Sequence, residues 1–271
     1  MRQEVTFSDI EASIAAYAPF SLQEGYDNSG LLLGERDTPV RGILLCLDVT
    51  ERVVQEAIEC GCNLVVSHHP LIFHGVKQLC GDTGISRAVI LALRLRVGIL
   101  AAHTNLDATR GGVSYALAQT LGVEVLRVLH ATVATVDGVG FGVVGMYPDP
   151  MNEEFFLQEV SSKLQLPIIR HSALLAHPVQ KIALCGGSGM EFFDDAIAAE
   201  VDVYLTADVK YHDFQRPDGR LLLLDVGHRE SELCALGLLK RILCESFSTF
   251  ACYVSVQDTN PVGYFLPNNV R

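Results

Sequence analysis

Two adjacent histidines, His68 and His69, stand where a short run of apolar and small residues ends. Imidazole is the commonest metal ligand near neutral pH, and two imidazoles at the end of a buried strand are costly in a core that has no use for them. Either both rings converge on a site of two metals where the backbone turns, or one ring is a ligand and the other lies on the surface.

Two further apolar runs end in the same way. Residues 96–102 lead into His103 and Asp107, and residues 221–226 lead into His228 and Glu232. Asp107 is either a capping residue of a loop or an anionic ligand. His228 and Glu232 are four residues apart at the start of a predicted helix, so they share one face, as an ordinary i,i+4 pair or as a ligand pair. Three strand ends with histidine and carboxylates nearby predict a metal centre at the carboxyl edge of a sheet.

The ligand types narrow the choice of metal. Three or more imidazoles with two carboxylates suit Zn, Fe or Mn better than Ca or Mg, which prefer shells made only of oxygen. A single catalytic zinc uses about three protein ligands plus water. Five or more ligands are therefore better explained by two divalent ions a few ångströms apart.

Other polar residues near these strand ends are candidates for supporting roles. His212 either shuttles protons near a metal-bound water or lies on the surface at a helix start, and Lys210 could hold an anion. Glu230 is either a proton carrier or a solvated acid in the first turn of its helix, where Ser231 is a plausible cap. The glycine-rich residues 186–189 either cradle a phosphate with their amides or form a tight turn from strand to helix.

Helix and strand patterns alternate along the chain, which predicts an α/β protein with mixed, mostly parallel sheets. We expect two α/β subdomains, residues 1–125 and 126–271, with the metal site at strand ends between them. Prolines predict a turn at 148–150 after an extended segment, and a closing strand within 250–256 either stays in the second subdomain or pairs back onto the first. The predicted strands are 42–48, 63–67, 97–102, 181–185, 201–205 and 221–226, and the predicted helices are 51–60, 85–94, 113–121, 152–164, 192–199 and 231–244.

Composition excludes several classes of protein. With 49% hydrophobic residues among 271, the chain can bury a large core. The net charge of −12 and the absence of a Lys/Arg block argue against a nucleic-acid partner. No apolar run is long enough for a membrane span, and the N-terminus lacks a signal-peptide pattern. Eight scattered cysteines without a C-x-x-C motif fit a reducing cytoplasm.

The order and spacing of several motifs resemble the dinuclear-metal-centre family named after the NGG-interacting factor three, known as GTP cyclohydrolase 1 type 2-like. The resemblance implies a toroidal homohexamer with metal sites facing an inner cavity, in the compact form without an inserted middle domain. Two residues depart from the usual pattern: Tyr26 replaces a tryptophan and Arg229 replaces a common tyrosine. The shared motifs are residues 26–30 (YDNSG), 67–71 (SHHPL), 103–108 (HTNLDA), 186–189 (GGSG), 208–213 (DVKYHD) and 227–232 (GHRESE).

The resemblance also implies a ligand set: His68, His69, Asp107, His228 and Glu232, with His103 as a further ligand or a supporting residue. One hypothesis is a metal-dependent hydrolase acting on a small anionic substrate, a nucleotide or other phosphate compound, in which His212 or Glu230 moves protons. Opening of the GTP ring is the reaction that the family name implies. The alternative is a non-catalytic, metal-binding or regulatory toroid, and the open coordination position that separates the two is not visible in a sequence.

Overall fold

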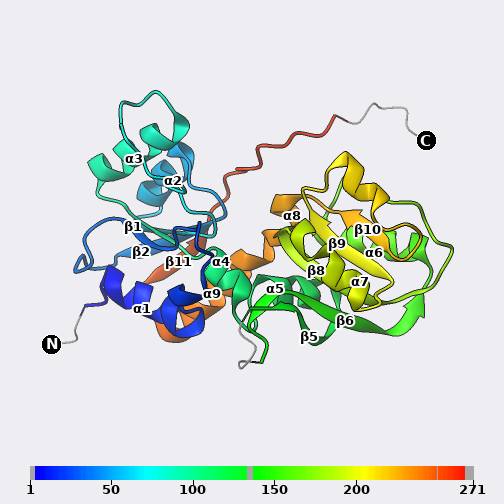
Figure 1. Ribbon diagram of the computed structural model, residues 1–271. Helices are drawn as coiled ribbons and strands as arrows, with labels where there is room; N and C mark the ends of the chain where they lie inside the picture. Colours follow the sequence, from blue (N-terminus) through cyan, green and yellow to red (C-terminus); the bar gives the residue numbers. More distant parts are fainter. Residues whose placement is uncertain (1–3, 133–136, 249, 266–271) are drawn as a thin grey trace.

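The computed structural model describes residues 4–132, 137–248 and 250–265, and it forms two lobes, each built on one β-sheet (Figure 1). The five-stranded sheet has the order β1-β4-β3-β2-β11 and the six-stranded sheet has the order β5-β6-β8-β9-β10-β7. Five of the nine pairings between described strands are parallel, so the predicted α/β class with mixed sheets is confirmed.

The first lobe is a sheet covered by helices on both faces. Its parallel strands are buried along their whole length, and alternate residues of each strand face opposite layers. Helices α1 (Phe7–Tyr17) and α9 (Cys234–Ser246) cover one face, and α2 (Glu51–Glu59) and α3 (Gly84–Leu95) cover the other. The strands are β1 (Gly30–Leu33), β2 (Gly42–Cys46), β3 (Leu64–Ser67), β4 (Gly98–Ala101) and β11 (Ala251–Val254).

The second lobe has the same layered construction. Helices α5 (Val113–Leu121) and α6 (Glu153–Leu164) pack on one face of its sheet, and α7 (Phe193–Ala198) packs on the other. The strands are β5 (Glu124–Ala131), β6 (Gly140–Met151), β7 (Arg170–His171), β8 (Val179–Ser188), β9 (Val203–Ala207) and β10 (Leu222–Asp225). The expected turn at 148–150 is wrong, because β6 continues to Met151.

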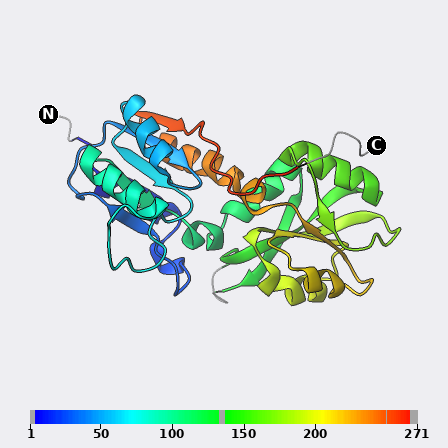
Figure 2. The same cartoon turned by 90° about the horizontal axis from the view of Figure 1, so that it is seen from above.

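Helices α4 (Thr104–Ala108), α5 and α8 (His228–Glu232) lie between the lobes in both views (Figures 1 and 2). The expected single helix at 231–244 is instead two helices: α8 starts at His228, and α9 follows it. The chain then returns to the first lobe, where β11 pairs in parallel with β2. No helix in the described part of the chain is both long and apolar enough to span a bilayer.

Candidate metal centre

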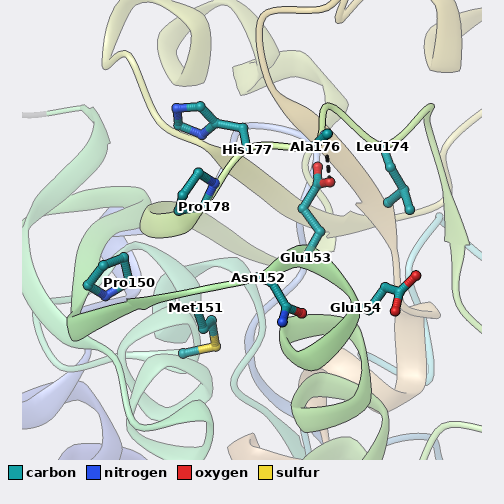
Figure 3. A pocket seen from close by; sticks show the side chains of 9 residues that line it. All are labelled: Pro150, Met151, Asn152, Glu153, Glu154, Leu174, Ala176, His177 and Pro178. Atoms are coloured by element: carbon teal, nitrogen blue, oxygen red, sulfur yellow. Dashed lines mark hydrogen bonds between the residues drawn. The ribbon is translucent and has the colours of Figure 1, made fainter.

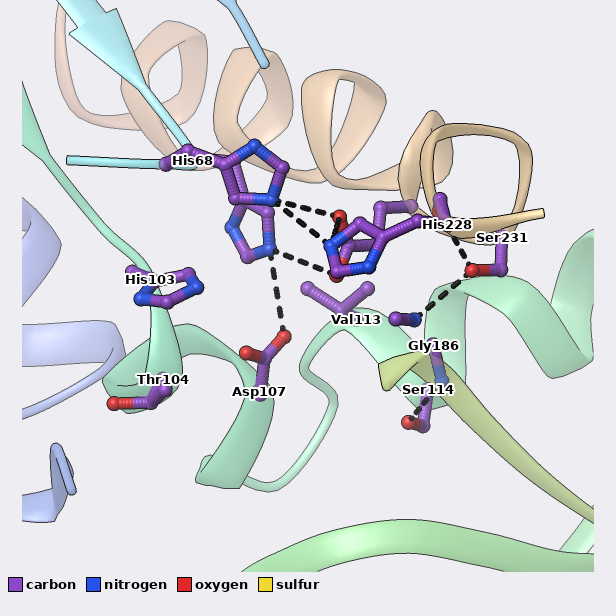
Figure 4. A network of polar contacts seen from close by, with 12 residues as sticks. His68, His103, Thr104, Asp107, Val113, Ser114, Gly186, His228 and Ser231 are labelled. Atoms are coloured by element: carbon purple, nitrogen blue, oxygen red, sulfur yellow. Dashed lines mark hydrogen bonds and ion pairs between the residues drawn. The ribbon is translucent and has the colours of Figure 1, made fainter. Parts of the chain in front are cut away.

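The structure brings all six predicted ligands together in the space between the lobes (Figure 4). His68 and His69 directly follow β3, and His103 caps the start of α4, which carries Asp107. These strands are neighbours in one sheet, so their carboxyl ends meet at one edge. The other lobe contributes α8, which has His228 at one end and Glu232 at the other.

Glu232 lies at the centre of this cluster. Its Oε2 is 2.9 Å from Nε2 of His69 and 3.1 Å from Nε2 of His228, while its Oε1 is 3.7 Å from Nε2 of His68. Asp107 approaches from the opposite side, with Oδ1 at 3.7 Å from the same nitrogen of His68. A buried carboxylate that faces three imidazoles is suited to bridge two neighbouring cations.

Each of the four histidines directs one ring nitrogen outward to a fixed acceptor. An outward Nδ1–H assigns the neutral tautomer whose Nε2 lone pair faces the cluster, and this arrangement orients imidazoles in protein metal sites. The acceptors are the Ala102 carbonyl for His68 (2.9 Å), Asp48 for His69 (2.8 Å), Asp27 for His103 (2.8 Å) and Asp208 for His228 (2.7 Å).

The inward nitrogens fit a divalent metal better than they fit each other. Nε2 of His68 is fully buried and has no hydrogen-bond partner among the described residues, and Nε2 of His69 lies 3.4 Å from Nε2 of His228. Buried lone pairs without a donor are costly, and a cation between them removes that cost. Two overlapping groups have ligand atoms within 4.8 Å of one another: His68–His69–His103 and His69–His228–Glu232.

Without metal, the carboxylates favour protonated imidazoles. Burial lowers the pKa of His69, but its contacts with Asp48 and Glu232 outweigh burial and raise the value to about 9. Burial likewise opposes protonation of His228, whose contacts with Asp208 and Glu232 raise its pKa to about 10. Burial alone would raise the pKa of Glu232, yet the surrounding imidazoles hold it well below its usual range.

These shifts predict opposite pH trends for the metal-free protein and for metal binding. A histidine with a raised pKa stabilises the fold below its unfolded pKa of 6.5, and this stabilisation is lost as pH rises through the folded value. The free energy of unfolding of chelator-treated protein should therefore fall between about pH 6.5 and 10. Metal affinity should rise over the same range, because ligands must lose their protons. Thermal unfolding and zinc titration would check both; a flat or rising metal-free curve would contradict the assignment.

Three carboxylates that the sequence analysis gave no role hold the histidines in place. Asp48 follows β2 at the same sheet edge as His69, so a strand-terminal acid beside a histidine-bearing strand was the available signal. Asp27 and Asp208 stood inside recognised motifs, but no local pattern showed which ring each would contact. Asp27 also accepts hydrogen bonds from Ser29 and from the Thr104 amide, which fixes its orientation.

Neutralising an outer acceptor should weaken metal binding without removing a ligand. Asp48→Asn and Asp208→Asn are each expected to lower zinc affinity about 10- to 100-fold, because the imidazole loses its orienting charge. Competition with a chromophoric chelator would measure this effect. Asp149→Asn, at an exposed position on β6, is the matched control and should leave the affinity unchanged.

The glycine-rich motif serves the carboxylate and not a phosphate. Residues 186–188 belong to the end of β8, so the expected turn into a helix is wrong. Gly187 has φ +65°, and a Cβ there would overlap Oε1 of Glu232. Its amide donates to Oγ of Ser231 (2.9 Å), which in turn donates to the His228 carbonyl, so Ser231 braces α8 and is not its cap.

The two predicted proton carriers lie in different surroundings. Glu230 is buried and accepts a hydrogen bond from Asn260 (2.9 Å), which corrects the expectation of a solvated acid. His212 is exposed in a 3-10 helix at Tyr211–Gln215, with its ring against Tyr211 and no hydrogen bond to the cluster among the described residues. Lys210 is exposed immediately before that helix.

Two cavities reach the cluster, and His228 borders both. One, of about 420 Å³, is bordered by Asp48, His69, Arg229 and Glu230 among others. The other, of about 190 Å³, is bordered by Tyr26, His103, Asp107, Phe141, Phe192 and Glu232 among others. Substrate-sized space therefore adjoins the candidate metal ligands on two sides.

A larger pocket, of about 630 Å³, lies away from the cluster near the start of α6 (Figure 3). Its buried acid, Glu153, accepts hydrogen bonds from the amides of Leu175 (2.8 Å) and Ala176 (2.9 Å). Both carboxylate oxygens are thus used to hold a loop. We assign this pocket no chemical role.

Fold and site together define a two-lobed α/β protein with a histidine–carboxylate cluster that could bind metal. A match over residues 5–261 to the family model for Duf34/NIF3 (NGG1p interacting factor 3) shows that the chain belongs to that family.

Related proteins support this assignment. A Clostridium perfringens protein named GTP cyclohydrolase 1 type 2 homolog is 34% identical over 83% of this chain and 86% of its own length. A Nostoc protein of the same name is 36% identical over 70% of this chain and 72% of its own. The crystal structure of the Staphylococcus aureus hypothetical protein SA1388 superposes with a TM-score of 0.90 at 27% identity, covering 97% of this chain and all of that one.

Proposed function

We propose that the protein is a hydrolase that uses two divalent ions, Zn, Fe or Mn, to act on a nucleotide or another phosphate-containing small molecule. The observation that carries this proposal is the set of inward imidazole nitrogens around Glu232, with cavities on either side. The name of the relatives, GTP cyclohydrolase 1 type 2 homolog, supports a nucleotide as the substrate.

The ions would be held by His68, His69, His103, Asp107, His228 and Glu232. When bound, such ions lower the pKa of water towards neutrality and polarise the bond under attack. The protein's own groups then bind and orient the substrate. Arg229 borders the 420 Å³ cavity and has only an exposed partner, Asp258, at 3.4 Å, so it offers positive charge to an anion.

Glu230 is the better placed of the two proposed proton carriers. Its carboxylate borders the same cavity as His69 and His228, and one oxygen is held by Asn260. His212 lies outside both cavities as described, so its participation stays a separate proposal.

The test is turnover by metal-loaded protein on a panel of nucleotides and phosphoesters. Glu230→Gln should lower kcat about 10²- to 10⁴-fold without loss of metal, and the same assay on His212→Ala decides whether that residue contributes. A panel without turnover, with metal still tightly held, would contradict the hydrolase and favour the non-catalytic scaffold. The hexameric toroid stays a prediction, which light scattering can check against six chains of 29.5 kDa.

A further inference from the structure

The segment that follows β11 crosses from the first lobe to α8. It is seen as the red trace in Figures 1 and 2, and we name residues 255–264 the C-terminal strap. It contains no helix or strand, yet it makes specific contacts along its length. The strap therefore links parts of the molecule that are distant in sequence.

The strap is first anchored on the first lobe. The Ser255 amide continues the sheet by donating to the Leu45 carbonyl (2.8 Å). The buried carboxylate of Glu56 on α2 then accepts hydrogen bonds from the Ser255 hydroxyl and from the Val256 amide. A buried acid satisfied by two successive strap residues fixes where the strap leaves the sheet.

Beyond this anchor, the strap contacts the groups that support the metal ligands. The Thr259 hydroxyl donates to Oδ2 of Asp48 (3.2 Å), whose Oδ1 accepts the Nδ1–H of His69 (2.8 Å). The next residue, Asn260, donates to Glu230 on α8 (2.9 Å). One residue of the strap thus braces a ligand from the first lobe, and its neighbour braces the helix that supplies His228 and Glu232.

The strap also borders the 420 Å³ cavity. Residues Asn260, Pro261, Val262 and Tyr264 line it together with His69 and His228. The same segment therefore supplies a wall of the cavity and a hydrogen bond to the support of one ligand. The other candidate ligand group, which includes His68 and His103, has outer acceptors at Ala102 and Asp27, and neither acceptor has a printed bond to the strap.

We propose that Thr259 is a positioning residue for the metal held by His69, His228 and Glu232. This inference rests on the proposed metal centre. The physical reason is that the Asp48 side chain is partly exposed, 37% by area, and can rotate unless its outer oxygen is held. With Oδ2 bonded to Thr259, Oδ1 stays directed at His69, and so does the lone pair on the far side of the ring.

The experiment compares Thr259→Val, which keeps the shape but removes the hydroxyl, with Thr259→Ser, which keeps the hydroxyl. Val256→Thr is the control, because that side chain is 86% exposed. Zinc affinity and stoichiometry are measured by competition with a chromophoric chelator. Thr259→Val should weaken one of two zinc equivalents about tenfold and leave the other unchanged, whereas the Ser and control variants should match the wild type.

A merely structural role would act differently. It would lower the unfolding temperature of chelator-treated protein and would not single out one zinc equivalent. A chain ending at Gln257 removes both Thr259 and Asn260, and it should weaken the same equivalent by a larger factor. Unchanged affinity for both equivalents in Thr259→Val and in the shortened chain would overturn the inference.

The outcome also separates this inference from the proposed function. If wild-type protein binds no zinc, both fail. If the wild type binds two equivalents and hydrolyses a substrate, while the Thr259 variants bind zinc normally, only the positioning role fails. If the wild type binds zinc without turnover and Thr259→Val selectively loses one equivalent, the positioning role stands and the hydrolase fails.

Discussion

Glu232→Gln is expected to weaken metal binding more than any other single change in this protein. The glutamine keeps the shape of the side chain but removes the negative charge that faces three imidazoles. Because Glu232 is only 3% exposed, no water-accessible anion nearby can take its place. Removing one partner of such a buried pair costs roughly 3–5 kcal/mol, which corresponds to a loss of affinity of about 10²- to 10³-fold.

Metal content after dialysis, measured by mass spectrometry, is the direct readout for this variant. We expect the wild type to retain both equivalents and Glu232→Gln to retain neither, with turnover lost in parallel. Glu245→Gln, an exposed acid on α9, controls for a general change of charge. A Glu232→Gln protein that holds two ions as tightly as the wild type would remove Glu232 from the centre.

Metal removal should have the second large effect, on the stability of the whole chain. The candidate ligands come from both lobes, so bound ions would tie β3, α4 and α8 together. A ligand that binds only the folded state at about 1,000 times its Kd contributes roughly 4 kcal/mol per site. For a chain of this size that corresponds to an unfolding temperature higher by on the order of 10 °C per site.

Calorimetry with and without chelator would measure this difference. The wild type should lose stability on chelation and regain it when zinc is restored, while Glu232→Gln should respond to neither treatment. An unfolding temperature that is the same with chelator, without it and with added zinc would show that metal does not stabilise this fold.

Local signals were enough to predict much of the framework. The helix at 113–121 ends at Gly122, as predicted, because that glycine adopts the left-handed conformation with φ 75° that closes a helix. Thr50 and Asn152 cap α2 and α6 through their side chains. The histidines at the strand ends were found because a polar residue that ends an apolar run stands out without any knowledge of its partner.

Contacts between distant residues could not be predicted in the same way. Nothing near Asp208 in the sequence indicates that His228 is its partner, and nothing near Thr259 points to Asp48. The error at 148–150 has a related cause. Pairing of β6 with β8 is irregular between Met146 and Met151, so the prolines there need not donate to the neighbouring strand, and the extended segment continues.

The most direct test of the central claim is a crystal structure of the protein grown with zinc or manganese, with anomalous data collected at the metal edge. Our account predicts two neighbouring anomalous peaks, both beside Glu232, one facing His68 and Asp107 and the other facing His69 and His228. A map without peaks among these side chains, or with peaks only at the molecular surface, would contradict it.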